Sequence, residues 1–441
     1  MSASVDLVMA NAFIPGKVAL PESEQRLIDR RSRLLGPAYR LMYDRPLHFV
    51  RGEGVWLYDT EGRAYLDAYN NVTSLGHCHS AVVEAIARQA GILATNTRYL
   101  QEIILDYAEK LLATFPAELG HVMFTCSGSE ANDLAYRIAK TATGGTGIVI
   151  TETAYHGITD AVSQFSPSLG AAVALGPHVR TVPAPNSYAE GSDVANAFGL
   201  SVERAAANLQ RHGIRPAMLI VDSLFTSDGV CAEPAGFLAP AVEAIRRAGG
   251  IFVADEVQPG FGRSGDRFWG FQRHGVVPDL VTLGKPMGNG QPVAGVVATP
   301  AVIEDFGRNA RYFNTFGGNA VSCAAALAVL DTIEKDRLMA NAGRMGERLR
   351  NGVAGLAETH DCIGAIRGAG LMMGVEILSR DERRPDAATT ARIVNGLRER
   401  GVLISSCGVA HNVLKIRPPL TFSPENADLL LERLGETIAA L

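Results

Sequence analysis

The chain has 441 residues, with 41 Lys and Arg against 46 Asp and Glu, which gives a formal net charge of −5 at pH 7. This acidic balance argues against a nucleic-acid-binding or membrane-surface protein, because both partners are anionic. Hydrophobic residues make up 47% of the chain, enough to bury cores of ordinary size. The six cysteines are scattered without a CxxC pair, which predicts neither a disulfide framework nor a zinc ribbon.

The sequence shows no targeting or membrane-spanning segment. Residues 1–10 contain Asp6 and no Lys or Arg, so they do not resemble a secretory signal. Residues 161–179 form a long uncharged stretch, but Pro167, Pro177 and several glycines interrupt it. Together with the scattered cysteines, these features favour a cytoplasmic protein.

The first elements expected along the chain are a charged helical arm within residues 21–45 and a hairpin formed by residues 54–59 and 64–67. From about residue 80, helical stretches alternate with short apolar runs. The runs lie at 121–126, 147–151, 218–222, 250–255 and 279–283. Near-continuous apolar strands separated by helices predict a parallel sheet covered on both faces, and therefore an α/β fold.

The pattern changes after residue 325. It predicts two long amphipathic helices, at 322–358 and 387–400, and short strands at 371–376 and 412–416. These elements indicate a separate α+β lobe.

A strand ending at Cys126 leads through Ser127, Gly128 and Ser129 into an amphipathic helix over residues 130–140. A small-residue turn at a helix N-terminus presents free backbone N–H groups to an anion. Gly128 allows close approach of a phosphate, and the hydroxyl of Ser129 is a further donor. A serine-capped helix that binds nothing has the same pattern.

Two other apolar strands end near charged residues, one at Asp255 and one shortly before Lys285. In open parallel sheets, ligands bind at the carboxyl ends of the strands. A confined lysine is a nucleophilic amine, and an aspartate nearby can hold a heteroaromatic nitrogen protonated. A surface lysine and a helix-capping aspartate are the alternatives. Taken with the phosphate turn, the set indicates a phosphorylated pyridine aldehyde.

These residues belong to a longer series of motifs that resembles the class III pyridoxal-phosphate aminotransferases, the ornithine and GABA aminotransferase type. The motifs are SGSEAN at 127–132, YHG at 155–157, DEVQ at 255–258, GFGR at 260–263, Lys285 and NTFGGN at 314–319. The resemblance covers residues 45–430 in motif order. It implies the aspartate-aminotransferase-like fold (fold type I) and an obligate homodimer with shared active sites. The implied large domain spans residues 66–324, and residues 1–65 and 325–441 form the small domain.

The resemblance also implies a role for individual residues. Lys285 forms the Schiff base with pyridoxal 5′-phosphate and later moves the substrate proton, while Asp255 pairs with the pyridinium nitrogen. The other cofactor-binding residues implied are Gly128 and Ser129 at the phosphate, Tyr155 and Val257 on the two ring faces, His156 beside Tyr155, Gln258 at the phenolic oxygen, and Thr315 of the partner subunit at the phosphate.

Two reactions remain open for such a site. The first is amino transfer from a primary amine, amino acid or amino sugar to a keto acid or aldehyde, and it is our preferred interpretation. The alternative is phosphate or ammonia elimination by a lyase acting on an amine like phosphoethanolamine. Several segments resemble the phospho-lyase branch of the family: NV at 71–72, GHCH at 76–79, NTRYL at 96–100, GKPMGNG at 284–290 and VLKIRPP at 413–419.

The chain also departs from the family pattern. It has Asp222-Ser223 where most class III transaminases carry Glu-Pro, and the phospho-lyase branch keeps the Glu. Lys415 stands where α-ketoglutarate-dependent enzymes often have an arginine, and a lysine lacks the bidentate fork that grips a carboxylate. His411 stands where the phospho-lyases have another basic residue.

Substrate residues are less constrained than cofactor residues. The substrate-binding candidates are Tyr43, Asn71, Arg98, Lys415 and Arg417, of which the last three are candidates for a substrate phosphate or carboxylate. No metal is expected, because neighbouring residues in His77-Cys78-His79 point apart.

Overall fold

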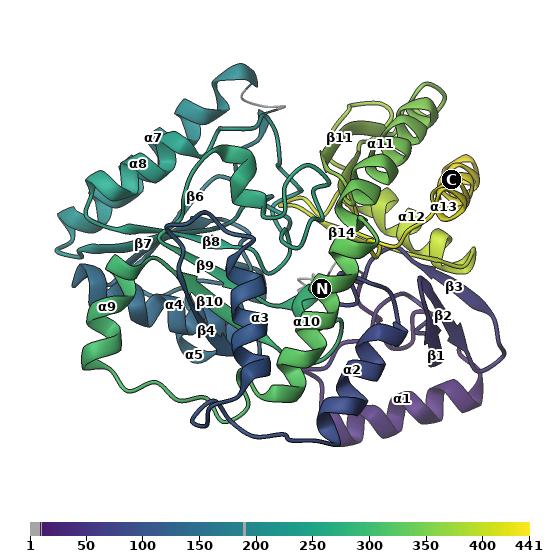
Figure 1. Cartoon of the computed structure of the whole chain (residues 1–441). Coiled ribbons are helices and arrows are strands. Elements are labelled where there is room, and N and C mark those ends of the chain that lie inside the picture. Colours follow the sequence, from purple (N-terminus) through teal and green to yellow (C-terminus); the bar gives the residue numbers. More distant parts are fainter. Residues whose placement is uncertain (1–8, 10, 188–190) are drawn as a thin grey trace.

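The computed structural model describes Met9, residues 11–187 and residues 191–441. Residues 1–8 and 10 of the predicted small domain therefore lie outside the described chain. A seven-stranded sheet and two four-stranded sheets form the framework, and together they confirm the predicted α/β, fold type I architecture (Figure 1). The helices are α1 (Glu22–Leu35), α2 (Ser80–Ala90), α3 (Glu102–Leu112), α4 (Gly128–Thr143), α5 (Asp160–Ser163), α7 (Val194–Arg211), α8 (Ala239–Arg247), α9 (Pro300–Asn309), α10 (Ala320–Lys335), α11 (Leu338–Ala357), α12 (Ala387–Glu399) and α13 (Pro424–Ala439).

The central sheet has the strand order β4-β10-β9-β8-β7-β5-β6. Its strands are β4 (His121–Thr125), β5 (Gly147–Thr151), β6 (Val179–Val182), β7 (Pro216–Asp222), β8 (Ile251–Asp255), β9 (Leu280–Leu283) and β10 (Ala294–Ala298). The five strands expected from apolar runs are confirmed. The sheet is mixed, because β10, which was not predicted, lies between β4 and β9 and runs antiparallel to both.

Helices cover both faces of this sheet because successive strand residues point in opposite directions. On β5, Ile148 and Ile150 join the cluster that includes α4 and α9, whereas Val149 joins the cluster that includes α7 and α8. In Figure 1, α7 and α8 lie above the sheet, and α4 and α9 lie below it. The carboxyl ends of β7, β8 and β9 are thereby brought together at one edge.

The two smaller sheets lie on the other side of the molecule (Figure 1). One has the order β1-β2-β3-β13 and the other has the order β11-β12-β15-β14. Their strands are β1 (Phe49–Glu53), β2 (Trp56–Asp59), β3 (Ala64–Asp67), β11 (Ile363–Ala369), β12 (Met372–Ile377), β13 (Val402–Leu403), β14 (Ser405–Cys407) and β15 (Val413–Ile416). The predicted hairpin is confirmed as β2–β3, and β3 pairs in parallel with the distant β13. The division into residues 66–324 and the two chain ends stays a prediction.

The long helix predicted at 322–358 is wrong. The chain forms α10 and α11 instead, separated at Arg337, whose φ of 51° lies in the left-handed region. No glycine or proline marks this break, so the hydrophobic periodicity of the sequence predicted one continuous helix across it. The helix predicted at 387–400 is confirmed as α12. Within the described part of the chain, no helix is long and apolar enough to cross a membrane.

Candidate active site

A cavity of about 210 Å³ opens where the strands of the central sheet end, and we call it the inner cavity. It is lined by Gly128, Ser129, Asn132, Tyr155, His156, Gly157, Asp222, Asp255, Val257, Gln258 and Lys285. Eight of the nine predicted cofactor-binding residues are therefore brought together. Thr315, the ninth, is exposed and does not line it.

The N-terminus of α4 lies at this cavity. Ser127 caps the helix by accepting a hydrogen bond from Glu130 N at 3.3 Å, and the backbone N–H groups of Gly128 and Ser129 are left for a ligand. The Ser129 hydroxyl oxygen accepts from Ile158 N at 3.2 Å, so its proton is free to be donated. A Cβ on Gly128 would lie 3.0 Å from both methyl carbons of Val257, so the close contact favours glycine here. The arrangement suits an anion.

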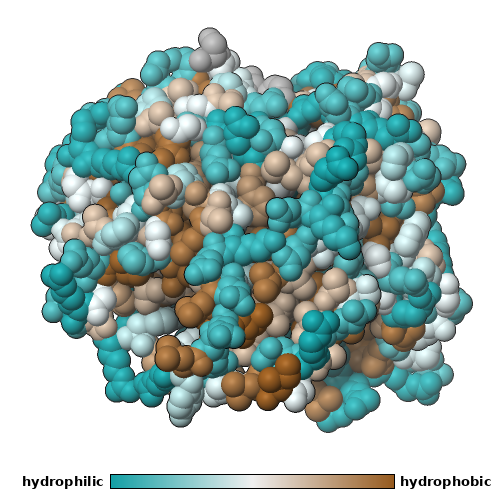
Figure 2. All heavy atoms as spheres, viewed as in Figure 1, coloured by the Kyte–Doolittle hydropathy of each residue, from teal (hydrophilic) through white to brown (hydrophobic). Residues whose placement is uncertain are grey.

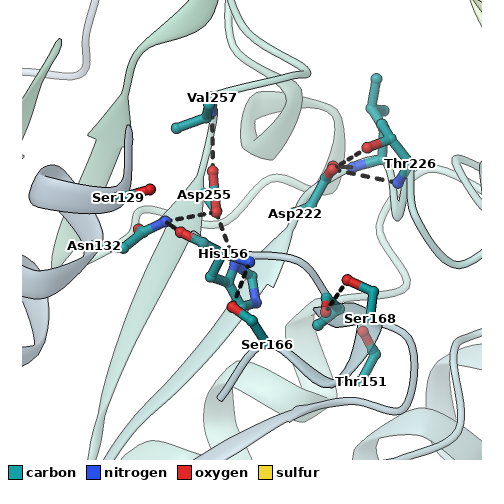
Figure 3. A network of polar contacts seen from close by, with 12 residues as sticks. Ser129, Asn132, Thr151, His156, Ser166, Ser168, Asp222, Thr226, Asp255 and Val257 are labelled. Atoms are coloured by element: carbon teal, nitrogen blue, oxygen red, sulfur yellow. Dashed lines mark hydrogen bonds and ion pairs between the residues drawn. The ribbon is translucent and has the colours of Figure 1, made fainter. Parts of the chain in front are cut away.

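Three hydrogen bonds hold the carboxylate of Asp255 in place (Figure 3). His156 Nδ1 lies 2.7 Å from Asp255 Oδ2, and Asn132 Nδ2 donates to the same oxygen at 3.0 Å. Val257 N donates to Asp255 Oδ1 at 3.1 Å. An ionised carboxylate only accepts, so His156 donates through Nδ1. Asp255 is thus presented as a fixed negative charge at the end of β8.

Lys285 lies two residues beyond the end of β9 and begins a short 3₁₀ turn, Lys285–Gly288. Burial lowers the pKa of its amine to about 8, and the charge of Arg417 contributes, while Asp255 and Asp222 oppose the shift. Its Nζ lies 5.9 Å from the centroid of the Tyr155 ring. A lysine that is partly neutral near pH 7 is a nucleophile and a base.

Asp222 lies beside Asp255, because β7 and β8 pair in register at these two residues. Its carboxylate turns back on the following loop, accepting from Leu224 N at 3.0 Å and from the N–H and hydroxyl of Thr226 (Figure 3). Burial raises its pKa, and the charge of Asp255 adds to the increase. Ser223 points elsewhere and donates to the buried Glu256 at 2.6 Å. Where most class III transaminases carry Glu-Pro, this chain therefore has a shorter carboxylate, that of Asp222, which accepts hydrogen bonds from the loop that follows it.

A second cavity of about 910 Å³, the outer cavity, shares Tyr155, Gln258 and Lys285 with the inner one. Lys415 and Arg417 line it, as do the side chains of Ser168, Ser227, Ser405, Ser406 and His411. The two predicted cations therefore lie next to the cofactor residues.

The other three substrate candidates line neither cavity. Tyr43 is buried and donates its hydroxyl to Ile404 O at 3.1 Å. Asn71 is buried with its amide 3.5 Å from Gln258 O, and the Arg98 guanidinium lies 3.7 Å above the Phe313 ring. Their roles at the substrate stay predictions.

Asn132 lies within the SGSEAN motif but was given no role from the sequence. It follows Gly128, the first residue of α4, by four positions, so it lies in the first turns of the helix and faces the edge of the sheet. This spacing is the feature of the sequence that could have identified it. The serines of the outer cavity carried none, because β14 and the loop after β7 are brought together only by the tertiary fold.

The inner cavity matches pyridoxal phosphate in its donor set: a helix N-terminus for the phosphate, a fixed carboxylate for the ring nitrogen, and an amine of lowered pKa for the aldehyde. The family pattern of class III aminotransferases matches residues 40–438. The chain belongs to the class III aminotransferase family. Enzymes of this family use pyridoxal 5′-phosphate, which confirms the predicted cofactor, and this chain is such an enzyme, a transaminase or a phospho-lyase.

Relatives of this class III enzyme divide between those two activities. An alanine–glyoxylate aminotransferase 2-like protein of Drosophila melanogaster is 38% identical over 95% of this chain and 88% of its own length. An ethanolamine-phosphate phospho-lyase homologue of Caenorhabditis elegans is 33% identical, over 95% and 93%. A solved phospholyase from Arthrobacter, in complex with phosphoethanolamine, is 42% identical with a TM-score of 0.91, covering 94% of this chain and all of that one.

Proposed function

We propose that the protein transfers the amino group of a small primary amine, amino acid or amino sugar to a keto acid or aldehyde. The observation that carries the proposal is the placement of Lys285 and Asp255 on the walls of one cavity whose end is the N-terminus of α4. A nucleophilic amine, an acceptor for a ring N–H and an anion site are the three groups this chemistry needs.

The chain's own residues divide the work as follows. Bound pyridoxal phosphate supplies an aldehyde that condenses with amines and a protonated ring that withdraws electrons from the substrate carbon. Lys285 Nζ would hold the cofactor's aldehyde carbon and, once an amine substrate had taken its place, would accept the proton from the substrate carbon. Asp255, held by His156 and Asn132, would keep the ring nitrogen protonated. Gly128 and Ser129 would hold the phosphate by N–H and hydroxyl donors.

The outer cavity supports transfer between two different substrates. Its volume of about 910 Å³ is much larger than a two-carbon amine requires, so a donor and an acceptor of different shapes fit in turn. Lys415 and Arg417 supply positive charge for a carboxylate on either of them. The four serines named above offer hydrogen bonds for hydroxyl groups, as on an amino sugar.

Phosphate elimination is the second candidate. It is favoured by the two adjacent cations, which suit a dianionic phosphate, and by the 42% identity to the Arthrobacter phospholyase. In that reaction Lys285 removes the same proton, the C–O bond breaks, and phosphate leaves with the bonding electrons. Water then releases an aldehyde and ammonia, and no acceptor is consumed.

One experiment separates the two candidates. Cofactor-loaded protein is mixed with a panel of primary amines that includes phosphoethanolamine, with and without keto acids, and ammonia, phosphate and the cofactor's visible absorbance are followed. Transfer predicts stoichiometric loss of the visible absorbance without ammonia, and many turnovers only when a keto acid is added. Repeated release of phosphate and ammonia without a keto acid would establish the lyase instead.

We also propose that the protein is a homodimer in which Thr315 completes the partner's phosphate site. Phe316, the neighbour of Thr315 in the chain, is 69% exposed, and in the loop between α2 and α3 Leu100 is 100% exposed and Ile92 71%. Brown apolar atoms stand out along the lower edge of Figure 2, where the loop between α2 and α3 runs in Figure 1. Burial of these side chains by a second copy would stabilise the pair. A fully active monomer in sedimentation would contradict the proposal.

A further inference from the structure

Gln258 connects the two cavities. It follows β8 by three residues, is buried, and lines both the inner and the outer cavity. Its amide oxygen accepts from Lys415 Nζ at 3.3 Å and from Arg417 Nη1. A single neutral oxygen therefore faces two cationic donors.

This arrangement fixes the orientation of the amide. The Arg417 guanidinium only donates hydrogen bonds, so the atom that faces it has to be the oxygen and not the nitrogen of Gln258. The amide nitrogen, with its two N–H donors, is left for the other side, where the residue lines the inner cavity. Gln258 is thereby held as a donor towards the cofactor.

Neither Lys415 nor Arg417 forms an ion pair with an Asp or Glu of the described chain; the charge of Asp222 acts on Lys415 through space without direct contact. Arg417 is anchored instead by Tyr69, donating from Nε to its carbonyl at 2.7 Å and lying 4.3 Å from its ring centroid. Burial lowers the pKa of Lys415, and the charge of Arg417 adds to the decrease. An anion entering the outer cavity would relieve this repulsion.

We infer that Gln258 is a positioning residue that couples anion binding in the outer cavity to the cofactor in the inner cavity. The inference rests on the proposed function, because it needs pyridoxal phosphate in the inner cavity. An anion that pairs with Lys415 and Arg417 competes for the donors that polarise Gln258. The amide N–H then donates less strongly, and the cofactor's bond to Lys285 holds its proton to a higher pH.

Other ionisable groups face the same space. Those of the inner cavity are Tyr155, His156, Asp222, Asp255 and Lys285. Those found only in the outer cavity are Tyr69, Cys407, His411, Lys415 and Arg417. An anion also acts on all of them directly through space, so the test has to separate that effect from the path through the amide.

The test is a pH titration of the visible absorbance of cofactor-loaded protein at increasing inorganic phosphate. It compares the native protein, Gln258→Ala and the control Gln210→Ala, an exposed residue of α7. Phosphate should raise the midpoint by at least about half a pH unit in the native protein and the control. The increase should fall to less than about half of that in Gln258→Ala. Calorimetry of phosphate binding accompanies each titration.

Three results would overturn the inference. An equal increase in Gln258→Ala would mean that the anion acts through space alone. An unchanged midpoint in the native protein, with phosphate bound by calorimetry, would mean that no coupling exists. If calorimetry detected no phosphate binding to the native protein, the outer cavity would not be an anion site. A protein that takes up no cofactor at all would instead contradict the proposed function, and the inference would fall with it.

Discussion

The lowered pKa of Lys285 has a direct kinetic consequence. Burial and Arg417 bring it from 10.5 to about 8. At pH 7 the neutral fraction of an amine is about 0.03% when its pKa is 10.5 and about 10% when its pKa is 8, a difference of roughly 300-fold. Only the neutral amine attacks an aldehyde, so the buried lysine should react with pyridoxal phosphate much faster than an exposed one.

The assay is stopped-flow mixing of cofactor-free protein with pyridoxal phosphate between pH 6 and 10. Because a lysine with a lowered pKa loses its proton earlier as the pH rises, the second-order rate constant should increase to a midpoint near 8. Nα-acetyl-lysine, whose side-chain amine is free, is treated in the same way and supplies the reference for the cofactor's own ionisation. A midpoint at or above 10 for the protein would mean that burial and Arg417 do not lower the pKa of Lys285.

Arg417→Met tests the cause of the shift. Removal of the positive charge that contributes to the lowered pKa of Lys285 should move the midpoint upwards and slow the reaction at pH 7. Arg204→Met, at an exposed position on α7, is the matched control and should leave the profile unchanged. An unshifted midpoint in Arg417→Met would assign the whole effect to burial.

Three further predictions concern the cofactor site and the dimer. Asp255→Asn should lower kcat at least ~100-fold while cofactor content, measured after alkaline release, stays near one per chain; undiminished turnover would contradict the role of the carboxylate. Gly157→Ala should weaken cofactor binding at least ~10-fold in equilibrium titration, because the added Cβ would lie 2.7 Å from Ser129 Cα. Gly213→Ala, where φ is also positive but open space surrounds the site, should retain affinity. Leu100→Glu should convert a dimer to a monomer in sedimentation, and an unchanged sedimentation coefficient would place the interface elsewhere.

The cofactor site could be predicted from the sequence because its parts follow local rules. Asp255 and Lys285 come at the ends of apolar strands, and Gly128 and Ser129 come between a strand and a helix. Parallel strands place their carboxyl ends at the same edge of the sheet, independently of the rest of the fold. The assignment of each residue to a part of the cofactor depended on the family resemblance.

What the sequence did not predict depends on tertiary contacts. Strand β10 is a short run of Ala, Gly and Val, and only its pairing with β4 and β9 makes it a strand. The break between α10 and α11 at Arg337 has no glycine or proline to mark it. The contact of Gln258 with Lys415 and Arg417 joins residues more than 150 positions apart, so no local pattern carries it.

The central claim is that Lys285, and not another buried lysine, bonds the cofactor. Lys415 is the natural competitor, because its pKa is also lowered by burial and it lines the adjoining outer cavity. Cofactor-loaded protein is reduced with borohydride, digested and mapped by mass spectrometry. We expect a single pyridoxyl group, on the peptide containing Lys285; a pyridoxyl group on Lys415 instead would contradict the assignment of Lys285.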